Sequence, residues 1–251
     1  MGVEINISFP PKRIISLVPS QTELLAALGL NEQLVGITKF CVHPPTWLGA
    51  KNIVGGTKNF NFEIIDDLKP DLIIGNKEEN YEEGIRALRV KYAVWMSDIA
   101  SLCDALDMIK SIGELTDHAK KARQLIHDIE FSFRHLKKKV PANVLYLIWR
   151  KPWMAVGHGT FIHTMIETIG WQNCLHEMPR YPRLTAEEIQ ALKPDYILLS
   201  SEPYPFQEKH KQELQNLCPD AKIALVDGEM FSWYGSRLVK APAYFNSLMI
   251  D

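Results

Sequence analysis

Residues 63–74, EIIDDLKPDLII, are nearly repeated as EEIQALKPDYIL at residues 187–198, and this repeat decides the fold. The two stretches align without a gap and share seven of their twelve positions, including the whole Leu-Lys-Pro-Asp block. Each copy predicts a short helix, ended by the Lys-Pro-Asp turn, and then a buried strand of the kind found in parallel sheets. An internal repeat indicates structural units of the same type. We therefore expect each half of the chain to hold its own α/β sheet.

Further strands and helices are predicted on both sides of the repeat. Short apolar runs of strand length occupy residues 13–18, 93–96, 143–149 and 223–226. Helical patterns that a glycine ends occupy residues 21–28 and 161–169. The predicted fold class is α/β, with a parallel sheet in each half.

Two helices are predicted between the halves. Residues 99–112 and 116–139 lack proline and repeat apolar residues at helical spacing, with a break near Gly113. The second helix, of about 23 residues, would be roughly 35 Å long. A helix is a stiffer connection than a Gly/Ser linker. We therefore divide the chain into an N-terminal α/β lobe, a helical connection with the backbone helix, and a C-terminal α/β lobe, at residues 1–98, 99–139 and 140–251.

The composition is that of a globular protein with room for two ordinary domains. The chain has 251 residues, of which 46% are hydrophobic and 23% are charged. Its net charge of -2 gives no basic field for nucleic acid or an anionic membrane, so we expect neither as a partner. We interpret the three lysines at residues 137–139 as the solvated end of a helix. No apolar stretch approaches the ~18 residues of a membrane-spanning helix.

The beginning of the chain and its cysteines bear on the compartment. Residues 1–7 alternate apolar and polar like an edge strand, and they lack the charged region and apolar block of a signal peptide. Either the protein is cytosolic or its leader has been removed. The cysteines are scattered without a Cys-x-x-Cys pair, so we interpret them as free thiols rather than as a disulfide framework or zinc site: Cys41, Cys103, Cys174 and Cys218.

The loops that follow the predicted strands are rich in aromatic residues. In open parallel sheets, ligands bind beyond the carboxyl ends of the strands. Trp, Tyr and Phe offer a large rigid contact area, which suits a broad flat ligand such as a tetrapyrrole. Packing in a core or an interface is the competing explanation for any one of them. The segments concerned are residues 18–20, 40–45, 55–60, 149–153, 180–182 and 229–234.

Acidic residues recur at the predicted helix starts. Residues 20–23 and 185–188 both match the Ser/Thr-x-x-Glu capping box, which gives their first residues a structural role. Glu63, after a predicted Asn61 cap, and Glu187 then share the same position in the first turn of their helices. Stabilisation of the helix dipole, worth about 0.3–1 kcal/mol, explains an acidic residue there. Their equivalence in the repeat also fits a shared role in binding a partner.

Sequence motifs of catalysis are mostly absent. The chain has no Gly-x-Ser-x-Gly, Walker, Gly-x-Gly-x-x-Gly or His-Glu-x-x-His motif. Cys41 and His43 lie two residues apart in a predicted loop, where side chains point apart, so we assign no thiol nucleophile. His43, His158, His163 or His176 could supply a metal ligand, but a surface histidine or a hydrogen-bonded buried one is the simpler explanation of each. We assign no catalytic residue and no metal site.

A family resemblance rests on three features: residues 12–24, KRIISLVPSQTEL, the paired Leu-Lys-Pro-Asp blocks and the long central helix. The chain resembles the helical-backbone metal receptors, which are the class III substrate-binding proteins of ABC importers, and most of all their cobalamin-binding branch. The resemblance implies a chelatase-like fold of two Rossmann-like lobes joined by one long helix. It also implies a ligand held between the lobes and no covalent chemistry.

Several positions carry over from the cobalamin-binding branch. Phe40 stands where that branch has a ligand-stacking tyrosine, and Tyr181 where it has a tryptophan. Trp153 lies near its phenylalanine, and Glu229 near an aspartate that touches the ligand. Thr57 departs from the pattern, because that branch has another tryptophan there. With the aromatic loops, the resemblance implies these ligand-binding residues: Pro19, Phe40, Trp153, Tyr181, Glu229, Phe231 and Trp233.

The resemblance also implies partners and a compartment. Glu63 and Glu187 match the pair of glutamates with which the family docks onto arginines of the importer's membrane subunits. We expect a monomer without a covalent cofactor, in the periplasm or cell envelope, although the start of the chain leaves a cytoplasmic protein open. The first candidate function is delivery of a cobalamin-like corrinoid or related metal chelate to an ABC importer. The alternatives are binding of haem or a ferric siderophore, and an enzyme on the same scaffold.

Overall fold

The computed structural model describes residues 6–47 and 49–248, which form two compact units. The first unit holds the chain up to residue 99 together with residues 103–130 and 234–237. The second unit holds residues 100–102 and 131–233 and the chain from residue 238 onward. Most of the predicted edge strand at residues 1–7 lies outside the described residues.

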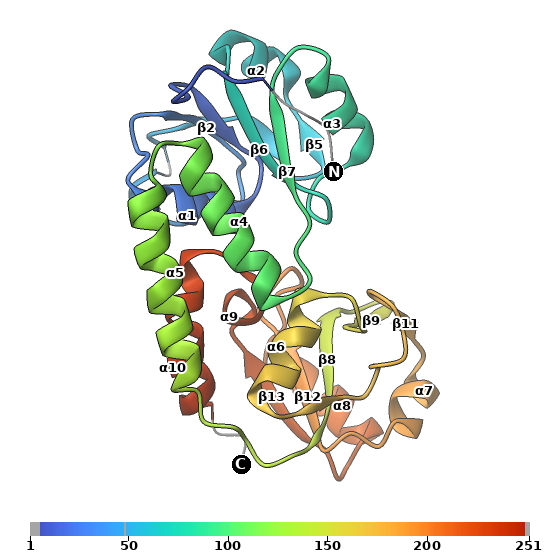
Figure 1. The fold of residues 1–251 in the computed structure, drawn as a ribbon. Coiled ribbons are helices and arrows are strands. Elements are labelled where there is room, and N and C mark those ends of the chain that lie inside the picture. Colours follow the sequence, from blue (N-terminus) through green and yellow to red (C-terminus); the bar gives the residue numbers. More distant parts are fainter. Residues whose placement is uncertain (1–5, 48, 249–251) are drawn as a thin grey trace. The chain divides into compact units, whose positions relative to one another are not determined.

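The sheet of the first unit is parallel throughout (Figure 1). Its strand order is β3 (Asn52–Ile53), β2 (Leu34–Ile37), β1 (Ile14–Ser16), β6 (Leu72–Asn76) and β7 (Val94–Ser97). A small hairpin, β4 (Gly55–Gly56) and β5 (Asn59–Phe60), follows β3. The helices that connect these strands are α1 (Pro19–Leu28), the 3-10 turn η1 (Pro45–Trp47), α2 (Phe62–Leu68) and α3 (Glu82–Arg89). This parallel α/β unit confirms the prediction for the first half.

The sheet of the second unit is mixed rather than parallel. Its order is β11 (Arg183–Leu184), β9 (Trp153–Ala155), β8 (Asn143–Trp149), β12 (Tyr196–Ser200) and β13 (Lys222–Val226), and β10 (Gln172–Asn173) also pairs with β8. Strands β8, β10, β12 and β13 are parallel, but β9 pairs antiparallel with both β8 and β11. Only residues 150–152 separate β8 from β9. A parallel crossover needs about a dozen residues or more, so this short turn can only reverse the chain.

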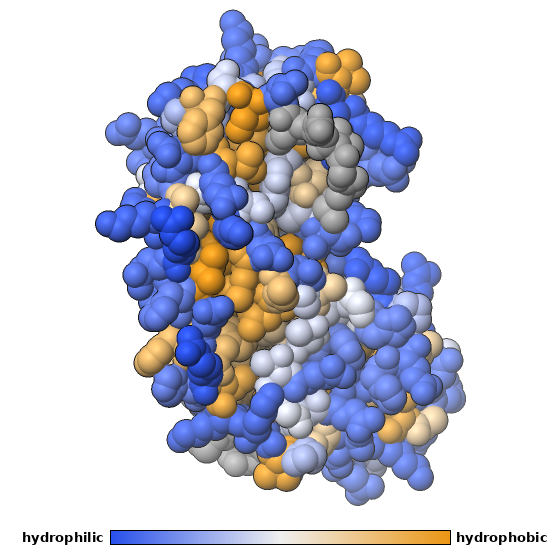
Figure 2. Space-filling view, viewed as in Figure 1, coloured by the Kyte–Doolittle hydropathy of each residue, from blue (hydrophilic) through white to orange (hydrophobic). Residues whose placement is uncertain are grey.

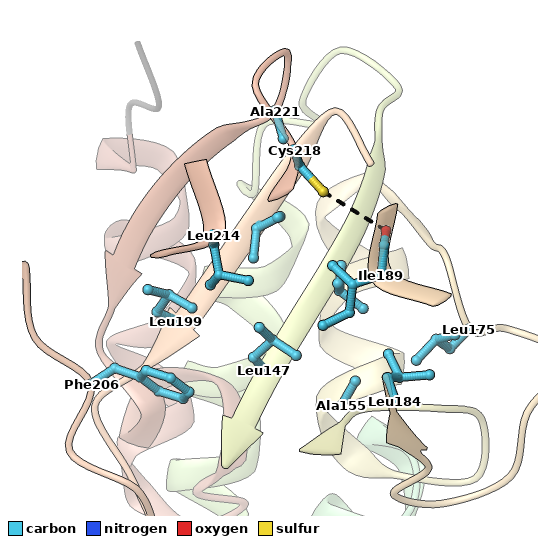
Figure 3. Packing of buried hydrophobic residues seen from close by; sticks show 12 residues of the cluster. Leu147, Ala155, Leu175, Leu184, Ile189, Leu199, Phe206, Leu214, Cys218 and Ala221 are labelled. Carbon is cyan, nitrogen blue, oxygen red and sulfur yellow. Dashed lines mark hydrogen bonds between the residues drawn. The ribbon is translucent and has the colours of Figure 1, made fainter. Parts of the chain in front are cut away.

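Buried apolar residues fill one face of the second sheet (Figure 3). Leu147 of β8 and Leu199 of β12 point toward Ile189 of α7 (Ala186–Ala191) and Leu214 of α8 (Glu208–Leu217), and all four are fully buried. Each such side chain contributes about 1.5–3 kcal/mol by leaving water. The remaining helices of this unit are α6 (Phe161–Ile169), α9 (Gly228–Ser232) and α10 (Ala241–Ser247), and the 3-10 turn η2 (Ser236–Val239) spans the boundary between the units.

The two copies of the repeat fold alike. In each copy the lysine of the Lys-Pro-Asp turn is left-handed, with φ of 45° at both Lys69 and Lys193. The aspartate that follows ties the turn to the start of the unit's first strand. Asp71 accepts hydrogen bonds from the backbone N–H groups of Lys12 and Arg13, and Asp195 accepts one from that of Asn143. The repeat therefore produces the same hydrogen-bonded connection between turn and strand in both units.

The helices between the two halves differ from the prediction. They are α4 (Leu102–Leu115) and α5 (Ala119–Arg134), so α5 has 16 residues and a length of about 24 Å. The break lies at residues 116–118 rather than at Gly113, which is buried inside α4. A Cβ at Gly113 would lie 2.3 Å from the Cβ of Ala122. Gly113 thus allows α4 and α5 to pack closely, and it does not end a helix.

The lysines at residues 137–139 are not a solvated helix end, because α5 ends before them. The amine of Lys138 donates to the carbonyl of Thr168 in the last turn of α6, at 2.6 Å. The amine of Lys139 donates to the carbonyl of Leu248, which caps α10, at 2.7 Å. These cations satisfy carbonyls at the ends of helices other than their own.

Hydrophilic side chains cover most of the face drawn in Figure 2, with apolar patches between them. Among the residues that the structure describes, Val90, Val140 and Phe9 are the most exposed large apolar residues, at 84%, 83% and 63%. Across the described parts of the chain, no helix has both the length and the apolar character needed to cross a bilayer.

Candidate ligand-binding site

Phe40 is an exposed aromatic residue at the carboxyl end of β2 in the first unit. Half of its surface is exposed (50%). Its ring lies against Gly56 of the β4–β5 hairpin, where a Cβ would stand 3.2 Å from the ring. The amine of Lys39 lies 5.1 Å from the ring centroid. Because Gly56 has no side chain, the Phe40 ring can pack against the hairpin. The ring then forms an exposed aromatic platform with a cation beside it.

A buried asparagine pair fixes the loops around this platform. The side chain of Asn76 accepts hydrogen bonds from the backbone N–H groups of Glu78 and Glu79. The amide of Asn80 donates to the carbonyls of Leu17 and Thr57, both at 3.1 Å. Asn80 thus joins the loops after β1 and β6 to the β4–β5 hairpin. Our reading of the sequence missed this pair, although two asparagines four residues apart directly after a buried strand are a signal for such a turn.

Helix α1 begins earlier than the capping pattern predicted. Its N-cap is Val18, which makes no side-chain cap, and Pro19 occupies the first turn. Proline favours the first helical position because its missing N–H would be unpaired there anyway. Ser20 therefore lies inside the helix, and the predicted capping box at residues 20–23 is wrong. Pro19 itself is half-buried at the carboxyl end of β1.

The thiol of Cys41 is a structural group. Cys41 is fully buried, and its Sγ lies 3.1 Å from the hydroxyl of Thr22 and 3.2 Å from that of Thr38. Burial raises the pKa of the Cys41 thiol, which opposes formation of the nucleophilic thiolate. Cys218 is also buried and Cys174 is half-buried, whereas Cys103 is exposed.

Trp153 lies in an aromatic cluster at the carboxyl end of β8. It is half-buried, and its ring lies parallel to that of Phe206, with 6.3 Å between centroids. The guanidinium of Arg150 lies 5.7 Å from the Trp153 ring, and an ion pair with Glu213 holds it there at 2.6 Å. Trp149, which ends β8, is 39% exposed. This end of the sheet presents aromatic surface beside a fixed cation.

Tyr181 repeats this combination. It is half-buried, and the guanidinium of Arg180 lies 5.8 Å from its ring. The backbone of Arg180 exchanges hydrogen bonds with Gly157 and His158, because Arg180 accepts from the first N–H and donates to the carbonyl of the second. A Cβ at Gly157 would lie 2.0 Å from the carbonyl oxygen of Met178, so only glycine allows this approach.

Trp233 is 6% exposed, and a half-buried carboxylate holds its indole in place. Its indole N–H donates to Oε1 of Glu202 at 2.9 Å, and the hydroxyl of Ser232 donates to the same oxygen at 2.8 Å. Burial raises the pKa of the Glu202 carboxyl, these two hydrogen bonds lower it, and the charges of Glu229 and Asp227 raise it. Glu202 thus holds Trp233 in place. The sequence analysis predicted Trp233 as a ligand contact but did not identify Glu202.

Two other predicted ligand contacts belong to α9. Glu229 is half-buried in the first turn of the helix. Phe231 is fully buried in the core of the second unit, with its ring centroid 5.1 Å from that of Tyr146 and 4.9 Å from that of Phe245. A side chain enclosed in this way has no surface for a ligand, so we leave Phe231 out of the candidate site.

The acidic residues of the repeat occupy equivalent and exposed positions. Asn61 caps α2 and Thr185 caps α7, the latter in a capping box with Glu188. Glu63 and Glu187 are each the second residue of their helix, as predicted. A hydrogen bond from its own backbone N–H and a second from Thr185 lower the pKa of Glu187. These contacts give it a local structural role, whether or not it binds a partner.

The pattern of the periplasmic binding proteins matches residues 14–219, which is most of the chain. The chain belongs to the periplasmic binding protein family. An uncharacterized ABC transporter substrate-binding lipoprotein of Bacillus subtilis is 25% identical over 94% of this chain and 79% of its own length. The vitamin B12-binding protein of Vibrio cholerae is 27% identical over 76% of this chain and 71% of its own. The structure of a periplasmic haem-binding protein from Pseudomonas aeruginosa has a TM-score of 0.81 at 20% identity and covers 96% of this chain and 95% of its own, which shows the shared fold.

Two of the candidate histidines of this periplasmic binding protein make hydrogen bonds within the protein. Nδ1 of His163 lies 3.1 Å from the amide of Asn173, and Nδ1 of His176 lies 3.0 Å from the carbonyl of the same residue. Within residues 6–47 and 49–248, no group of three or more His, Cys, Asp or Glu side chains could hold a metal ion.

Proposed function

We propose that this protein is the substrate-binding protein of an ABC importer and that its ligand is a corrinoid or a related metal chelate. The observation that supports this most is the pairing of aromatic rings with cations beside strands of both sheets. Lys39 beside Phe40, Arg150 beside Trp153 and Arg180 beside Tyr181 all lie 5.1–5.8 Å from the ring centroid. Rings stack on a flat ligand, and cations attract carboxylates or phosphates at its periphery. A large planar chelate with anionic substituents offers both.

Titration of the ligand-free protein tests this function. Cyanocobalamin, dicyanocobinamide and haemin are added separately while the fluorescence of the six tryptophans is followed. Binding of either corrinoid with a saturable, one-to-one quench supports the proposal. Cobinamide lacks the phosphate of cobalamin, so weaker binding of cobinamide would indicate that a cationic side chain binds the phosphate. Absence of saturable binding by all three compounds would reject the proposed ligand class.

Haem or a ferric siderophore is the second candidate ligand. The three cations favour it, because carboxylates are the anionic groups of haem and of many siderophores, and guanidinium groups bind carboxylates well. Saturable binding of haemin with a shifted Soret band, together with no response to corrinoids, would replace the first candidate with this one. A protein that instead converts any of these compounds would be an enzyme on the same fold.

We also propose that Glu63 and Glu187 dock this protein onto the membrane subunits of the importer and that the protein works as a monomer in the cell envelope. Their equivalent second positions in α2 and α7 and their exposure support this role. Two like charges at matching places of a repeat suit a partner that is itself built from two similar subunits. Arginine side chains on that partner would complement them.

A further inference from the structure

The β4–β5 hairpin, against which the Phe40 ring packs, is bonded at its turn to a single neighbouring loop. The amide of Asn80 donates to the carbonyl of Thr57 at 3.1 Å. The amine of Lys58 donates to the carbonyl of Glu78 at 2.5 Å. Thr57 and Lys58 are the two residues between β4 and β5, and their partners both belong to the loop between β6 and α3. This loop therefore determines where the hairpin turn lies.

Asn80 makes the firmer of these two contacts. Its side chain is 5% exposed, whereas Lys58 is exposed and can exchange its bond with water. Oδ1 of Asn80 accepts from the backbone N–H of Asn76 at 2.9 Å, and its amide also donates to the carbonyl of Leu17 at 3.1 Å. Any other orientation of the amide would leave buried polar groups without a partner, which is costly. The bond to the hairpin turn is thus fixed in direction.

The hairpin in turn contacts the loop that carries Phe40. The backbone N–H of Lys39 donates to the carbonyl of Gly55 at 2.9 Å. The Phe40 ring lies on Gly56, which directly precedes the carbonyl group that Asn80 holds. Displacement of the hairpin turn would therefore move the surface beneath the ring and the acceptor of the residue before it.

We propose that Asn80 is a positioning residue of the candidate ligand site. Its amide fixes the hairpin turn, and the hairpin sets the place of the Phe40 ring. Asn80 acts through the ring, because its own side chain is covered, whereas Phe40 is 50% exposed and offers a surface to a ligand. Every contact in this argument lies inside the first unit. The inference rests on the proposed function only in its ligand arm.

The first arm of the test needs no ligand. The protein is labelled with 4-fluorophenylalanine, and the fluorine resonance of Phe40 is assigned with Phe40→Tyr. In Asn80→Ala and in Asn80→Asp we expect this resonance to shift or broaden. Aspartate keeps an oxygen for the N–H of Asn76 but loses the amide hydrogens, so it isolates the donated bonds. We also expect amide hydrogen exchange of Lys39 to accelerate by about tenfold or more, because its acceptor Gly55 is held less firmly.

A matched control separates positioning from general loss of stability. Thr116→Val removes a hydrogen bond of another buried side chain in the first unit, because the hydroxyl of Thr116 donates to the carbonyl of Ile112 at 2.7 Å. It should leave the Phe40 resonance and the exchange of Lys39 unchanged. Asn80→Asp fills almost the same volume as the wild-type side chain and serves if Asn80→Ala fails to fold. An unchanged Phe40 resonance in the folded Asn80 variants overturns the inference.

The second arm measures binding of cyanocobalamin and haemin by the wild type, Asn80→Ala, Phe40→Ala and the double variant. Whichever compound binds the wild type should bind Asn80→Ala at least several-fold more weakly and Thr116→Val equally well. Asn80→Ala should cause little further loss once residue 40 is alanine, because a positioning residue acts through the ring that it positions. An unchanged affinity in Asn80→Ala, or the same loss with and without the Phe40 ring, overturns the inference. If neither compound binds the wild type, the proposed ligand class fails, while the first arm still decides the role of Asn80.

Discussion

At the scale of single residues, the candidate site consists of aromatic rings together with cations that lie beside them. Phe40, Trp153 and Tyr181 each have a cation near the ring, and one of these cations, Arg150, is itself held by the carboxylate of Glu213. Fixing the cation before the ligand arrives reduces the entropy lost on binding. A ligand that lacks anionic groups would gain only the stacking energy.

Replacement of Trp153 by alanine should weaken ligand binding by about 1–3 kcal/mol, because it removes stacking area and leaves Arg150 without its ring. Calorimetric titration with the compound that the wild type binds measures this loss. Phe131→Ala is the control, since Phe131 is 55% exposed on α5 and far along the chain from any strand end. Equal affinity of Trp153→Ala and the wild type, with intact circular dichroism, would remove Trp153 from the site.

Glu202 should make stability depend on pH. Its pKa is raised in the folded protein, chiefly by burial, so the folded state holds this proton more tightly than the unfolded state does. The resulting stabilisation is present below the ordinary pKa of glutamate and is lost as the pH rises through the raised value. Glu202→Gln still accepts hydrogen bonds from Ser232 and Trp233 but cannot ionise.

Urea unfolding of the wild type and Glu202→Gln between pH 4 and pH 8 checks this. The free energy of unfolding of the variant should improve relative to that of the wild type as the pH rises. Glu82→Gln, at an exposed glutamate in the first turn of α3, is the control for the same change of side chain at the surface. A constant difference between Glu202→Gln and the wild type across this range would mean that the Glu202 carboxyl titrates normally.

At the scale of elements, the repeat accounts for more of the fold than any single motif. It predicts α2 with β6 and α7 with β12, and the structure adds that Asp71 and Asp195 each bind the start of the first strand of their unit. The same symmetry places Glu63 and Glu187 at the second position of their helices. An element that is built twice in this way can present two equivalent groups to one partner.

Reversal of both charges, Glu63→Arg with Glu187→Arg, should abolish or strongly weaken capture by the cognate transporter in lipid nanodiscs while ligand affinity stays unchanged. The matched control is Glu208→Arg, because Glu208 is also a first-turn glutamate of a helix. If the glutamates serve only their own helices, the reversal instead lowers the free energy of unfolding by about 1 kcal/mol or less per site. Normal capture of the double variant would contradict the docking role.

Elements whose signals are local were predictable from the sequence, and those set by packing or chain reversal were not. Strand β8 and helix α6 have the predicted bounds, because an apolar run and a Gly170 cap are both read locally. Antiparallel β9 followed from a turn of only three residues after β8, which the sequence reading overlooked. Gly113 looked like a helix end, yet its role depends on Ala122, and that contact exists only after α4 and α5 pack.

The site shows the same division. Phe40, Trp153 and Tyr181 could be proposed from aromatic loops and a family resemblance. In the structure Phe40 is exposed, and Trp153 and Tyr181 are half-buried. Phe231 lies in an equally aromatic segment of the sequence, but it belongs to α9 and is enclosed by Tyr146 and Phe245. Nothing in the sequence distinguishes a ring that faces solvent from one that the core encloses, since both sit directly after a strand.

At the scale of the whole molecule, the chain passes from one unit to the other five times, at residues 99–100, 102–103, 130–131, 233–234 and 237–238. One of these passages lies inside α5, so separating the units would bend hydrogen-bonded helical turns. Small-angle scattering curves recorded without ligand and with the compound that binds should therefore nearly superpose. A marked contraction on binding would show that the passages act as hinges.

Because the cysteines differ in burial, one of them is suited to selective chemical labelling. Burial raises the pKa of Cys41 and Cys218, and it raises that of Cys174 to about 12. Because maleimides react with the thiolate, these three react slowly near pH 7, whereas Cys103 stands exposed in the first turn of α4. A fluorophore can thus be attached to the unmodified wild-type chain at one place, remote in sequence from the aromatic loops, so that binding and transporter capture can be followed without engineering a label site.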